Sequence, residues 1–227
     1  MREGSAGAII VAAGRSERMG GVDKLLAPLA GRPLIAHAIA AFACHHEIGE
    51  LVVVASEANR DAIEGIVGDL APAGRVVLGG ERRRDSVRAG LAGIATSEYV
   101  VVHDGARPLV TGELIAVALA GARETGAALC AVPVSDTVKR VDEAGLVRTT
   151  VSREGLWLAQ TPQAFRTDLL RRAHAATDID STDDAALVEL LGEPLRVVMG
   201  SSRNLKVTAP EDLALAEALM MSATDLH

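Results

Sequence analysis

The sequence predicts an α/β fold: a Rossmann-like, mostly parallel sheet with helices on both faces and a protruding β-hairpin arm. Short apolar segments alternate with helical patterns from the first residues onward. Hydrophobic residues make up 49% of the 227-residue chain, and aromatic residues make up only 2%. A core of Ala, Val, Leu and Ile suits β-branched strands covered by Ala- and Leu-rich helices. A chain of this length can bury such a core as one large domain over residues 1–227.

Six short apolar runs are expected to form the strands of this sheet. They cover residues 8–12, 51–55, 76–78, 99–103, 127–132 and 195–199. Strands that alternate with helices predict parallel neighbours joined by helical crossovers. Ligands of such sheets bind at the carboxyl ends of the strands, so that edge is the expected functional one.

Six helical patterns lie between most of these strands. They cover residues 33–43, 85–94, 111–124, 167–176, 183–191 and 210–221. Pro33 opens the first helix, where its missing N–H costs no hydrogen bond. Thr208 and Glu211 have the spacing of a capping box before the last helix, and Ser181 or Thr182 can cap the helix at 183–191.

One segment breaks this alternation. Residues 137–153 contain two β-rich stretches around the turn residues 142–145 and carry no helical pattern. We therefore expect a hairpin arm over residues 134–156. A two-stranded ribbon alone is marginal in water, so the arm is expected to pack on the matching ribbon of a second subunit and form a homodimer. The alternative is that the arm folds back on its own domain.

Charge and apolar patterning exclude several classes of partner. With 23 Lys and Arg against 30 Asp and Glu, the formal net charge is -7, which disfavours general binding to nucleic acid or to an anionic membrane. No apolar run reaches membrane-spanning length, and the N-terminal residues lack the apolar core of a signal peptide. Cys44 and Cys130 belong to no metal-binding pattern and are expected to be small core residues. We expect a soluble, cytoplasmic protein.

The most informative motif is IIVAAGRSERMGGVDK, residues 9–24, which joins a buried-strand pattern to a glycine-rich basic loop. Its glycines let the backbone approach a ligand, and Arg15, Arg18 and Lys24 supply positive charge. Backbone N–H groups and cations of this kind can hold a polyphosphate. The spacing fits neither the P-loop nor GxGxxG, so a different nucleotide-handling loop is implied. The alternative is an ordinary strand-to-helix connection with solvated arginines.

Two further motifs follow predicted strands at the same edge. HDGARP places Asp104 and Arg107 just past a strand end, where an α/β enzyme can position a metal-associated carboxylate and a phosphate contact. GGERRRDSV has two glycines before a basic cluster, Arg82 to Arg84, with Ser86 near a helix start. Cations at a helix N-terminus oppose its dipole, which favours an anionic partner; a solvated helix start is the other interpretation.

Together these residues resemble one family, the 2-C-methyl-D-erythritol 4-phosphate cytidylyltransferases of the non-mevalonate isoprenoid pathway. AAGRSERMG is similar to the signature loop of the family. HDGARP, PVSDTVKR, TVSREGLWLAQTPQAF, STDDAAL and NLKVTAPEDLALAE match its later motifs in order, over nearly the whole chain. The resemblance implies one nucleotidyltransferase domain over residues 1–227 that uses CTP, methylerythritol phosphate and Mg²⁺ and releases pyrophosphate.

The resemblance also implies a role for each matching residue. Arg18 and Lys24 would stabilise charge around the α-phosphorus, and Arg153 and Lys206 would orient the attacking phosphate, with Arg153 reaching the site of the partner subunit. The polyol phosphate would be contacted by Asp104, Arg107, Thr137 and Thr182, and the cytidine side by Ala12, Ala13, Gly14, Gly80, Glu81 and Ser86. Asp104 would also bind the metal, directly or through water.

The implied chemistry needs no general base, because a phosphate monoester with a second pKa of about 6 is already largely anionic at neutral pH. Cations and positioning are needed instead. Two alternatives stay open. One is a cytidylyltransferase for ribitol 5-phosphate or another polyol phosphate, and the other is a nucleotide-binding module without turnover.

Three positions depart from the common family pattern: Glu17, Asp23 in place of a frequent proline, and Glu81 in place of a shorter acid. The first two reduce the positive charge of the loop and leave the roles of its outer residues open. Trp157 and residues 161–163 are interpreted as core and edge packing, the commoner role for an indole.

Overall fold

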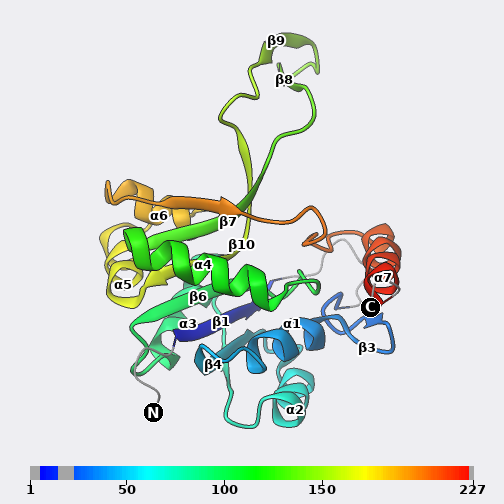
Figure 1. Ribbon diagram of the computed structural model, residues 1–227, viewed down its shortest axis with the longest axis vertical. Helices are drawn as coiled ribbons and strands as arrows, with labels where there is room; N and C mark the ends of the chain where they lie inside the picture. The colour runs from blue at the N-terminus through cyan, green and yellow to red at the C-terminus, as the bar shows by residue number, and fades with distance from the viewer. Residues whose placement is uncertain (1–5, 15–22, 225–227) are drawn as a thin grey trace.

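The computed structural model describes residues 6–14 and 23–224, and it has the α/β architecture expected from the sequence (Figure 1). Seven of the described strands form one central sheet. In order across the sheet they are β11 (Arg196–Met199), β7 (Ala127–Pro133), β10 (Trp157–Arg166), β6 (Tyr99–Asp104), β1 (Ala6–Ala12), β4 (Ile48–Ala55) and β5 (Arg75–Leu78). β10 is antiparallel to both of its neighbours, and the other pairs are parallel. The mostly parallel sheet is confirmed.

Helices cover both faces of this sheet (Figure 1). One face packs against α1 (Leu34–Ala43), α2 (Arg60–Leu70) and α4 (Gly112–Thr125), and the other against α3 (Arg83–Gly93), α5 (Thr167–Ala176) and α6 (Ala185–Leu190). At one side of the molecule, α7 (Pro210–Thr224) lies next to the short ribbon of β2 (Pro28–Leu29) and β3 (Arg32–Pro33). Within the described residues, the helices lack the length and apolar character needed to span a membrane.

The strand β1 shows how the two cores arise. Side chains alternate between the faces of a strand, so Ile10 packs in one apolar core with Ile35 of α1, and Ile9 packs in the other with Leu91 of α3. A strand that buries both faces has a continuous apolar sequence, which is why residues 8–12 are recognisable as a strand from the sequence alone.

All six predicted strands and all six predicted helices are present, with bounds that differ by a few residues. Apart from the two-residue strands β2 and β3, the prediction lacks two elements, α2 and β10. The helical signal of α2 is weak because only Ile63 and Val67 are buried on it and because its sequence contains two glycines. β10 gives a poor strand signal because glutamine and proline interrupt its apolar residues.

Two side chains lie outside the core in which the sequence analysis placed them. Trp157 begins β10 where the strand leaves the sheet, and it is 41% exposed. Thr161 and Gln163, further along the same strand, are buried as the packing interpretation expects. Cys44 is exposed, whereas Cys130 is buried as predicted. A strand that extends beyond the sheet exposes its first side chains, which corrects the interpretation of Trp157.

The predicted capping box before α7 is shifted by one residue. The helix begins at Pro210, so the carboxylate that reaches back belongs to Asp212 rather than to Glu211. It accepts hydrogen bonds from the N–H groups of Thr208 at 2.7 Å and of Ala209 at 2.9 Å.

The predicted cap of α6 is also provided by a different residue. The Asp183 carboxylate, rather than the hydroxyl of Ser181 or Thr182, accepts from the N–H of Ala186 at 3.0 Å. The Ser181 hydroxyl donates instead to the carbonyl of Asp183 at 2.6 Å and therefore supports the capping residue.

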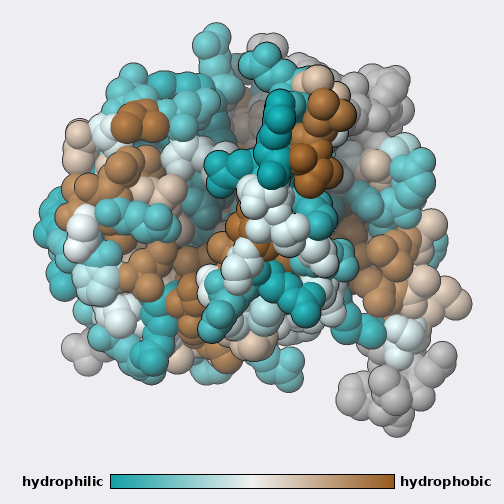
Figure 2. Space-filling view, turned by 90° about the horizontal axis from the view of Figure 1, so that it is seen from above, coloured by the Kyte–Doolittle hydropathy of each residue, from teal (hydrophilic) through white to brown (hydrophobic). Residues whose placement is uncertain are grey.

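The predicted hairpin is present. β8 (Val138–Val141) and β9 (Val147–Val151) pair antiparallel and stand out from the body of the molecule, at the top of Figure 1. Figure 2 views the molecule from this side and shows apolar side chains, in brown, beside hydrophilic ones, in teal. The exposed apolar residues of the arm and its base include Val141, Leu146, Val147, Leu156, Trp157 and Leu158. The use of the arm as a dimer contact stays a prediction.

β10 belongs to two parts of the molecule. Its first residues, 157–159, pair with β7 near the arm, and its last residues, 163–166, pair with β6. The register with β7 is irregular between Ala159 and Gln163. Gln160 and Thr161 lie in this irregular stretch, and their side chains bond to neighbouring loops.

Candidate active site

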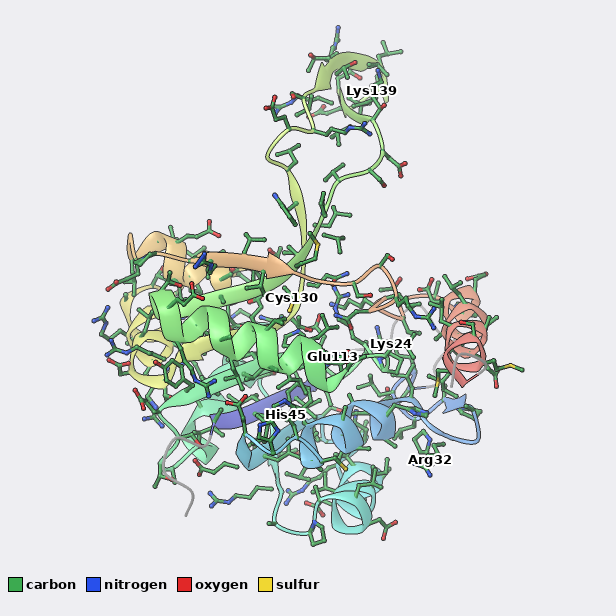
Figure 3. The ribbon with its side chains drawn as sticks, in the orientation of Figure 1. Lys24, Arg32, His45, Glu113, Cys130 and Lys139 are labelled. Atoms are coloured by element: carbon green, nitrogen blue, oxygen red, sulfur yellow. The ribbon has the colours of Figure 1, made fainter. Side chains whose placement is uncertain are left out.

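A cavity of about 500 Å³ lies at the carboxyl ends of β1, β4, β5 and β6, the edge at which the sequence predicts a ligand. Its volume is in the range typical of small-molecule sites. The described residues that line it include four cations and three carboxylates. These are Lys24, Arg82, Arg83 and Lys206 together with Glu57, Glu81 and Asp104. Lys24 lies on the side of the molecule nearest α7 (Figure 3).

Eight residues that the sequence analysis assigned to the site line this cavity. They are Ala13, Gly14, Lys24, Gly80, Glu81, Ser86, Asp104 and Lys206. At Gly14 the position of a Cβ has no heavy atom within 4 Å, as expected of a glycine that faces a ligand. The sheet topology therefore brings residues 13–14, Lys24, the GGERRRDSV segment, Asp104 and Lys206 to one place.

Five assigned residues that the structure describes are not part of this lining: Ala12, Arg107, Thr137, Arg153 and Thr182. Arg18 lies outside the described residues. Ala12 is buried at the end of β1, and Arg107 lies beside Asp104 with little exposure. Thr137 and Arg153 are exposed in the arm, and Thr182 is exposed before α6.

Asp104 is the electrostatic centre of the cavity. Its carboxylate lies 2.8 Å from Nζ of Lys206, 3.6 Å from Nη2 of Arg83 and 3.9 Å from Nε of Arg107. Burial alone would raise the pKa of Asp104, but these positive charges outweigh it and hold the pKa at about 2. The carboxylate therefore stays ionised and holds cations from three segments close together.

A hydrogen-bonded chain beneath Asp104 fixes its backbone. The N–H of Asp104 donates to Oγ1 of Thr161 at 3.0 Å, and this Oγ1 lies 3.1 Å from Nδ1 of the buried His103. Nε2 of His103 lies 3.1 Å from the carbonyl oxygen of Arg107. A carbonyl only accepts, so Nε2 carries the proton and Nδ1 accepts from the Thr161 hydroxyl. Burial lowers the pKa of His103 to about 4, which agrees with a neutral imidazole.

Folding stability should fall as the pH drops from 6.5 to about 4. The pKa of His103 is about 4 in the folded chain against 6.5 for an ordinary histidine. The unfolded state therefore binds more protons across this window, and stability rises with pH through it. The shift corresponds to about 3 kcal/mol at most. Urea unfolding of the native chain and of His103→Gln between pH 4 and 8 measures the effect; equal pH dependence in both chains would assign it to other groups.

Arg83 is held by the buried side chain of Asp184, which in turn contacts the buried His174. Its Nη1 donates to Oδ2 of Asp184 at 2.6 Å, and Oδ1 of Asp184 lies 2.9 Å from Nε2 of His174. Asp184 and His174 are 1% and 4% exposed. Burial alone would raise the pKa of Asp184, but the Arg83 charge and the His174 hydrogen bond lower it. The guanidinium of Arg83 thus connects a buried carboxylate to the carboxylate of Asp104 at the cavity.

The other arginines of the GGERRRDSV cluster have partners within the protein. Arg84 is buried, and its Nη1 donates to the carbonyl of Ile179 at 2.8 Å. Arg82 pairs with Asp85 at 2.9 Å and with Asp178 at 3.0 Å. The anionic partners expected for this cluster are therefore carboxylates of the protein itself, and the buried Arg84 joins α3 to the segment after α5.

Comparisons with known proteins show the family of this chain. A family model described as 2-C-methyl-D-erythritol 4-phosphate cytidylyltransferase, IspD, matches residues 6–222. The chain belongs to the IspD family. A protein of Dehalococcoides mccartyi with the same description is 43% identical over 216 residues, which cover 94% of this chain and 95% of that protein. A bifunctional enzyme IspD/IspF of Desulforudis audaxviator is 46% identical over 94% of this chain and 56% of its own length.

Solved IspD-type structures share the fold. The 4-diphosphocytidyl-2C-methyl-D-erythritol synthase of Anaerococcus prevotii superposes with a TM-score of 0.84 at 31% identity, and the match covers 96% of this chain and 100% of that one. The 2-C-methyl-D-erythritol 4-phosphate cytidylyltransferase of Thermus thermophilus superposes with a TM-score of 0.78 at 36% identity, covering 95% and 98%. Cytidylyltransferase activity and the α/β fold are therefore properties of the family to which this chain belongs.

In this IspD-family chain, the loop after β5 is shaped by its own packing. A Cβ at Gly79 would lie 2.4 Å from Cβ of Ala13, and a Cβ at Gly80 would lie 2.5 Å from Cβ of Asp85. Protein neighbours therefore require glycine at both positions. Ser86 Oγ accepts from the N–H of Gly80 at 3.3 Å. Ser86, which was assigned to the cytidine side, therefore also fixes the conformation of the loop at Gly80.

The NLKVT motif of this IspD-family chain positions Lys206 through buried contacts. Asn204 is fully buried, and its Nδ2 donates to the carbonyl of Thr161 at 2.8 Å. The carbonyl of Asn204 accepts from Nη1 of Arg107 at 2.7 Å. One residue after Lys206, the backbone N–H donates to the carbonyl of Ala106 at 2.8 Å. Both sides of Lys206 are therefore attached to the HDGARP loop or to β10.

Several residues that shape the site are absent from the sequence-based assignment. Arg83 has no distinguishing mark within the arginine cluster, and Thr161 lies in a segment assigned to packing. Asp184 lies inside the STDDAAL motif, where only Thr182 was assigned to the substrate. Asn59 follows the carboxyl end of β4, and this position at the expected ligand edge is the signal that could have identified it.

Proposed function

We propose that this cavity is where the chain, a cytidylyltransferase, joins CTP to 2-C-methyl-D-erythritol 4-phosphate, giving 4-diphosphocytidyl-2-C-methyl-D-erythritol and pyrophosphate. The observation that carries the proposal is that Lys24, Arg83 and Lys206 line one cavity at the carboxyl edge of the sheet, in a chain that matches the family model over residues 6–222. The reaction brings two anions together, so it requires a cavity with several cations.

The reaction needs alignment and charge stabilisation rather than proton transfer. A phosphate oxygen of the polyol substrate forms a bond to the α-phosphorus of CTP. The bond from that phosphorus to the oxygen that bridges to the β-phosphorus breaks, and pyrophosphate leaves with this oxygen. The attacking phosphate is largely anionic at neutral pH, since its second pKa is about 6. The buried His103 then has a structural role, because the reaction requires no base.

The cations divide between the two substrates. Lys24, together with Arg18 by resemblance, stabilises the charge that develops around the α-phosphorus. Lys206 orients the attacking phosphate from its place beside Asp104. Arg83 adds a third positive charge between Asp104 and the buried Asp184. Ala13 and Gly14 after β1, together with Gly79 and Gly80 after β5, line the remaining part of the cavity, where we place the cytosine.

Mg²⁺ is the cofactor that we propose for this reaction. Among residues 6–14 and 23–224 there is no group of three His, Cys, Asp or Glu side chains that could hold a metal ion alone. Mg²⁺ commonly uses one or two carboxylates and completes its shell with water and substrate phosphates. The ionised carboxylate of Asp104, one of three carboxylates in the lining, fits this requirement. A bound ion would neutralise part of the triphosphate charge.

A homodimer would give the two assigned arm residues, Thr137 and Arg153, a role in substrate binding. Thr137 and Arg153 are exposed in the arm rather than in the cavity lining of their own chain. The arm also exposes apolar side chains at Val141, Leu146 and Val147, which favours burial against another surface. We therefore assign Arg153 and Thr137 to the cavity of a partner subunit.

Replacing Arg153 by alanine should raise the KM for methylerythritol phosphate about tenfold or more and leave the KM for CTP nearly unchanged. The reason is that the guanidinium is assigned to the attacking phosphate alone. Initial rates with each substrate varied in turn measure the two KM values. Arg148→Ala is the matched control, because Arg148 is an exposed arm arginine that pairs with Asp142. Equal losses for both substrates, or a monomeric Arg153→Ala chain, would assign Arg153 to assembly instead.

A pyrophosphate-release assay tests the proposed function directly. With CTP and Mg²⁺, turnover should be much faster with methylerythritol phosphate than with ribitol 5-phosphate. The family match favours this outcome. Preference for ribitol 5-phosphate would support the polyol alternative, and tight CTP binding without product from any polyol phosphate would support a non-catalytic module. Cytoplasmic localisation stays a prediction.

A further inference from the structure

Asn59 connects the two ends of the chain segment that contains the glycine-rich loop. Its side chain is 1% exposed, and its Nδ2 donates to the carbonyl of Ala12 at 3.0 Å and to Oδ2 of Asp23 at 2.6 Å. Ala12 is the last residue of β1, and Asp23 immediately precedes Lys24. The buried amide of Asn59 therefore connects Ala12, before this segment, to Asp23, at its end.

The amide of Asn59 is not used to cap its own helix. Asn59 stands at the N-cap of α2, where asparagine commonly accepts from a backbone N–H of the first turn. Here the side chain makes no cap hydrogen bond, and its Oδ1 accepts from the N–H of Ser56 at 2.8 Å. These three hydrogen bonds of the amide lie outside α2, so stabilisation of that helix does not explain them.

Asp23 links Asn59 to the backbone on the far side of Lys24. Its Oδ2 accepts from Asn59, and its Oδ1 accepts from the N–H of Leu25 at 2.9 Å. Leu25 is 3% exposed, and its carbonyl accepts from the N–H of Ile35 at 3.0 Å. Lys24 therefore lies between a carboxylate held by Asn59 and a buried leucine attached to α1. Its backbone is fixed relative to both β1 and α1.

We propose that Asn59 is a positioning residue for cytidylyl transfer: through Asp23 it sets the place of Lys24 relative to the carboxyl end of β1, an inference that rests on the role proposed for Lys24. Removing the amide leaves the carbonyl of Ala12 and the N–H of Ser56 without this partner and releases one oxygen of Asp23. A misplacement of about 1 Å can cost about 10²-fold in rate, even when the substitution is not in contact with the reacting atoms.

A double-mutant cycle of Asn59→Ala and Lys24→Ala, read as kcat/KM for CTP at saturating methylerythritol phosphate, tests the proposal. Asn59→Ala should lower kcat/KM by about 30- to 100-fold in the native chain, and by less than about threefold in Lys24→Ala. Equal losses in both backgrounds would overturn the proposal, because Asn59 would then act independently of Lys24. If Lys24→Ala is itself as active as the native chain, the role of Lys24 fails and the positioning role fails with it.

A second cycle covers the case in which Asn59→Ala does not fold. Asn59→Asp keeps an acceptor for the N–H of Ser56 but places a second carboxylate against Asp23, so it should lose activity. Adding Asp23→Asn restores a donor and an acceptor between the two side chains and should recover about tenfold of the lost kcat/KM. A folded double variant without recovery would overturn the proposal.

Thr111→Ala is the matched control for loss of a buried or capping polar group. Thr111 Oγ1 accepts from the N–H of Leu114 at 3.3 Å at the start of α4. This variant should lower the melting temperature and leave kcat/KM for CTP close to the native value. Comparison of the two variants at matched stability separates a positioning role of Asn59 from general destabilisation.

Discussion

Replacing Lys24 by alanine should lower kcat/KM for CTP by about 10²- to 10³-fold without a comparable loss of folding stability. Lys24 lines the cavity at the carboxyl edge of the sheet, and its ammonium is assigned to charge that develops around the α-phosphorus. An interaction that strengthens in the transition state lowers the barrier, and loss of one such group typically costs this factor. Steady-state kinetics and urea unfolding of the same preparations measure both quantities.

The control for Lys24→Ala is Arg172→Ala. Arg172 is an exposed cation on α5 that pairs with Glu193, so its removal changes the net charge by the same amount at a distance from the cavity. Its kcat/KM should stay close to the native value. Native kinetics in Lys24→Ala would contradict the assignment, and a loss of activity that follows only the loss of stability would make Lys24 a structural residue.

The second large effect is expected at Lys206. Lys206→Ala should lower kcat by about 10²-fold or more, because Nζ lies at the cavity 2.8 Å from the Asp104 carboxylate and is assigned to the attacking phosphate. Burial raises the pKa of Asp104, and Lys206 is the largest opposing charge. Its removal therefore raises that pKa. Initial rates at neutral pH, with each substrate varied in turn, measure kcat.

Two variants sharpen this test. Lys206→Arg keeps the positive charge but not the compact ammonium, so it should restore only part of the lost kcat. Arg203→Ala removes a cation from the same segment, one that donates to the hydroxyl of Ser222 on α7 rather than to Asp104. If Arg203→Ala loses as much activity as Lys206→Ala, the effect belongs to the conformation of the segment.

The fold is largely predictable because its strands are buried on both faces. β1 and residues 51–55 of β4 are continuous apolar runs, and glycine or polar residues lie next to their ends. β10 is the exception. It carries an exposed tryptophan at one end and a glutamine and a proline in the middle, so neither alternation nor a continuous run identifies it. The tertiary position of β10 between two other strands determines its structure.

The site is predictable where a residue follows a strand or belongs to a recognisable motif. Asp104 and Lys206 are such residues. Arg83, within GGERRRDSV, and Asn59, after the carboxyl end of β4, lie at the same edge, but their roles cannot be read from the sequence because they depend on partners far away along the chain. Arg83 donates to Asp184, 101 residues later, and Asn59 donates to Ala12, 47 residues earlier. A single sequence contains no local signal for such contacts, and the resemblance to a family supplied roles only for the residues within its motifs.

The irregular stretch of β10 has a consequence for how this molecule can evolve. Residues 163–166 have their register fixed by β6, whatever the length of the arm, while residues 157–159 are paired with β7 alone. Insertions or deletions around the tip of the arm can therefore accumulate without displacing Thr161 from beneath Asp104. The length of the arm and the support beneath Asp104 are therefore set by different stretches of one continuous strand, so related chains can differ in the first while the second stays unchanged.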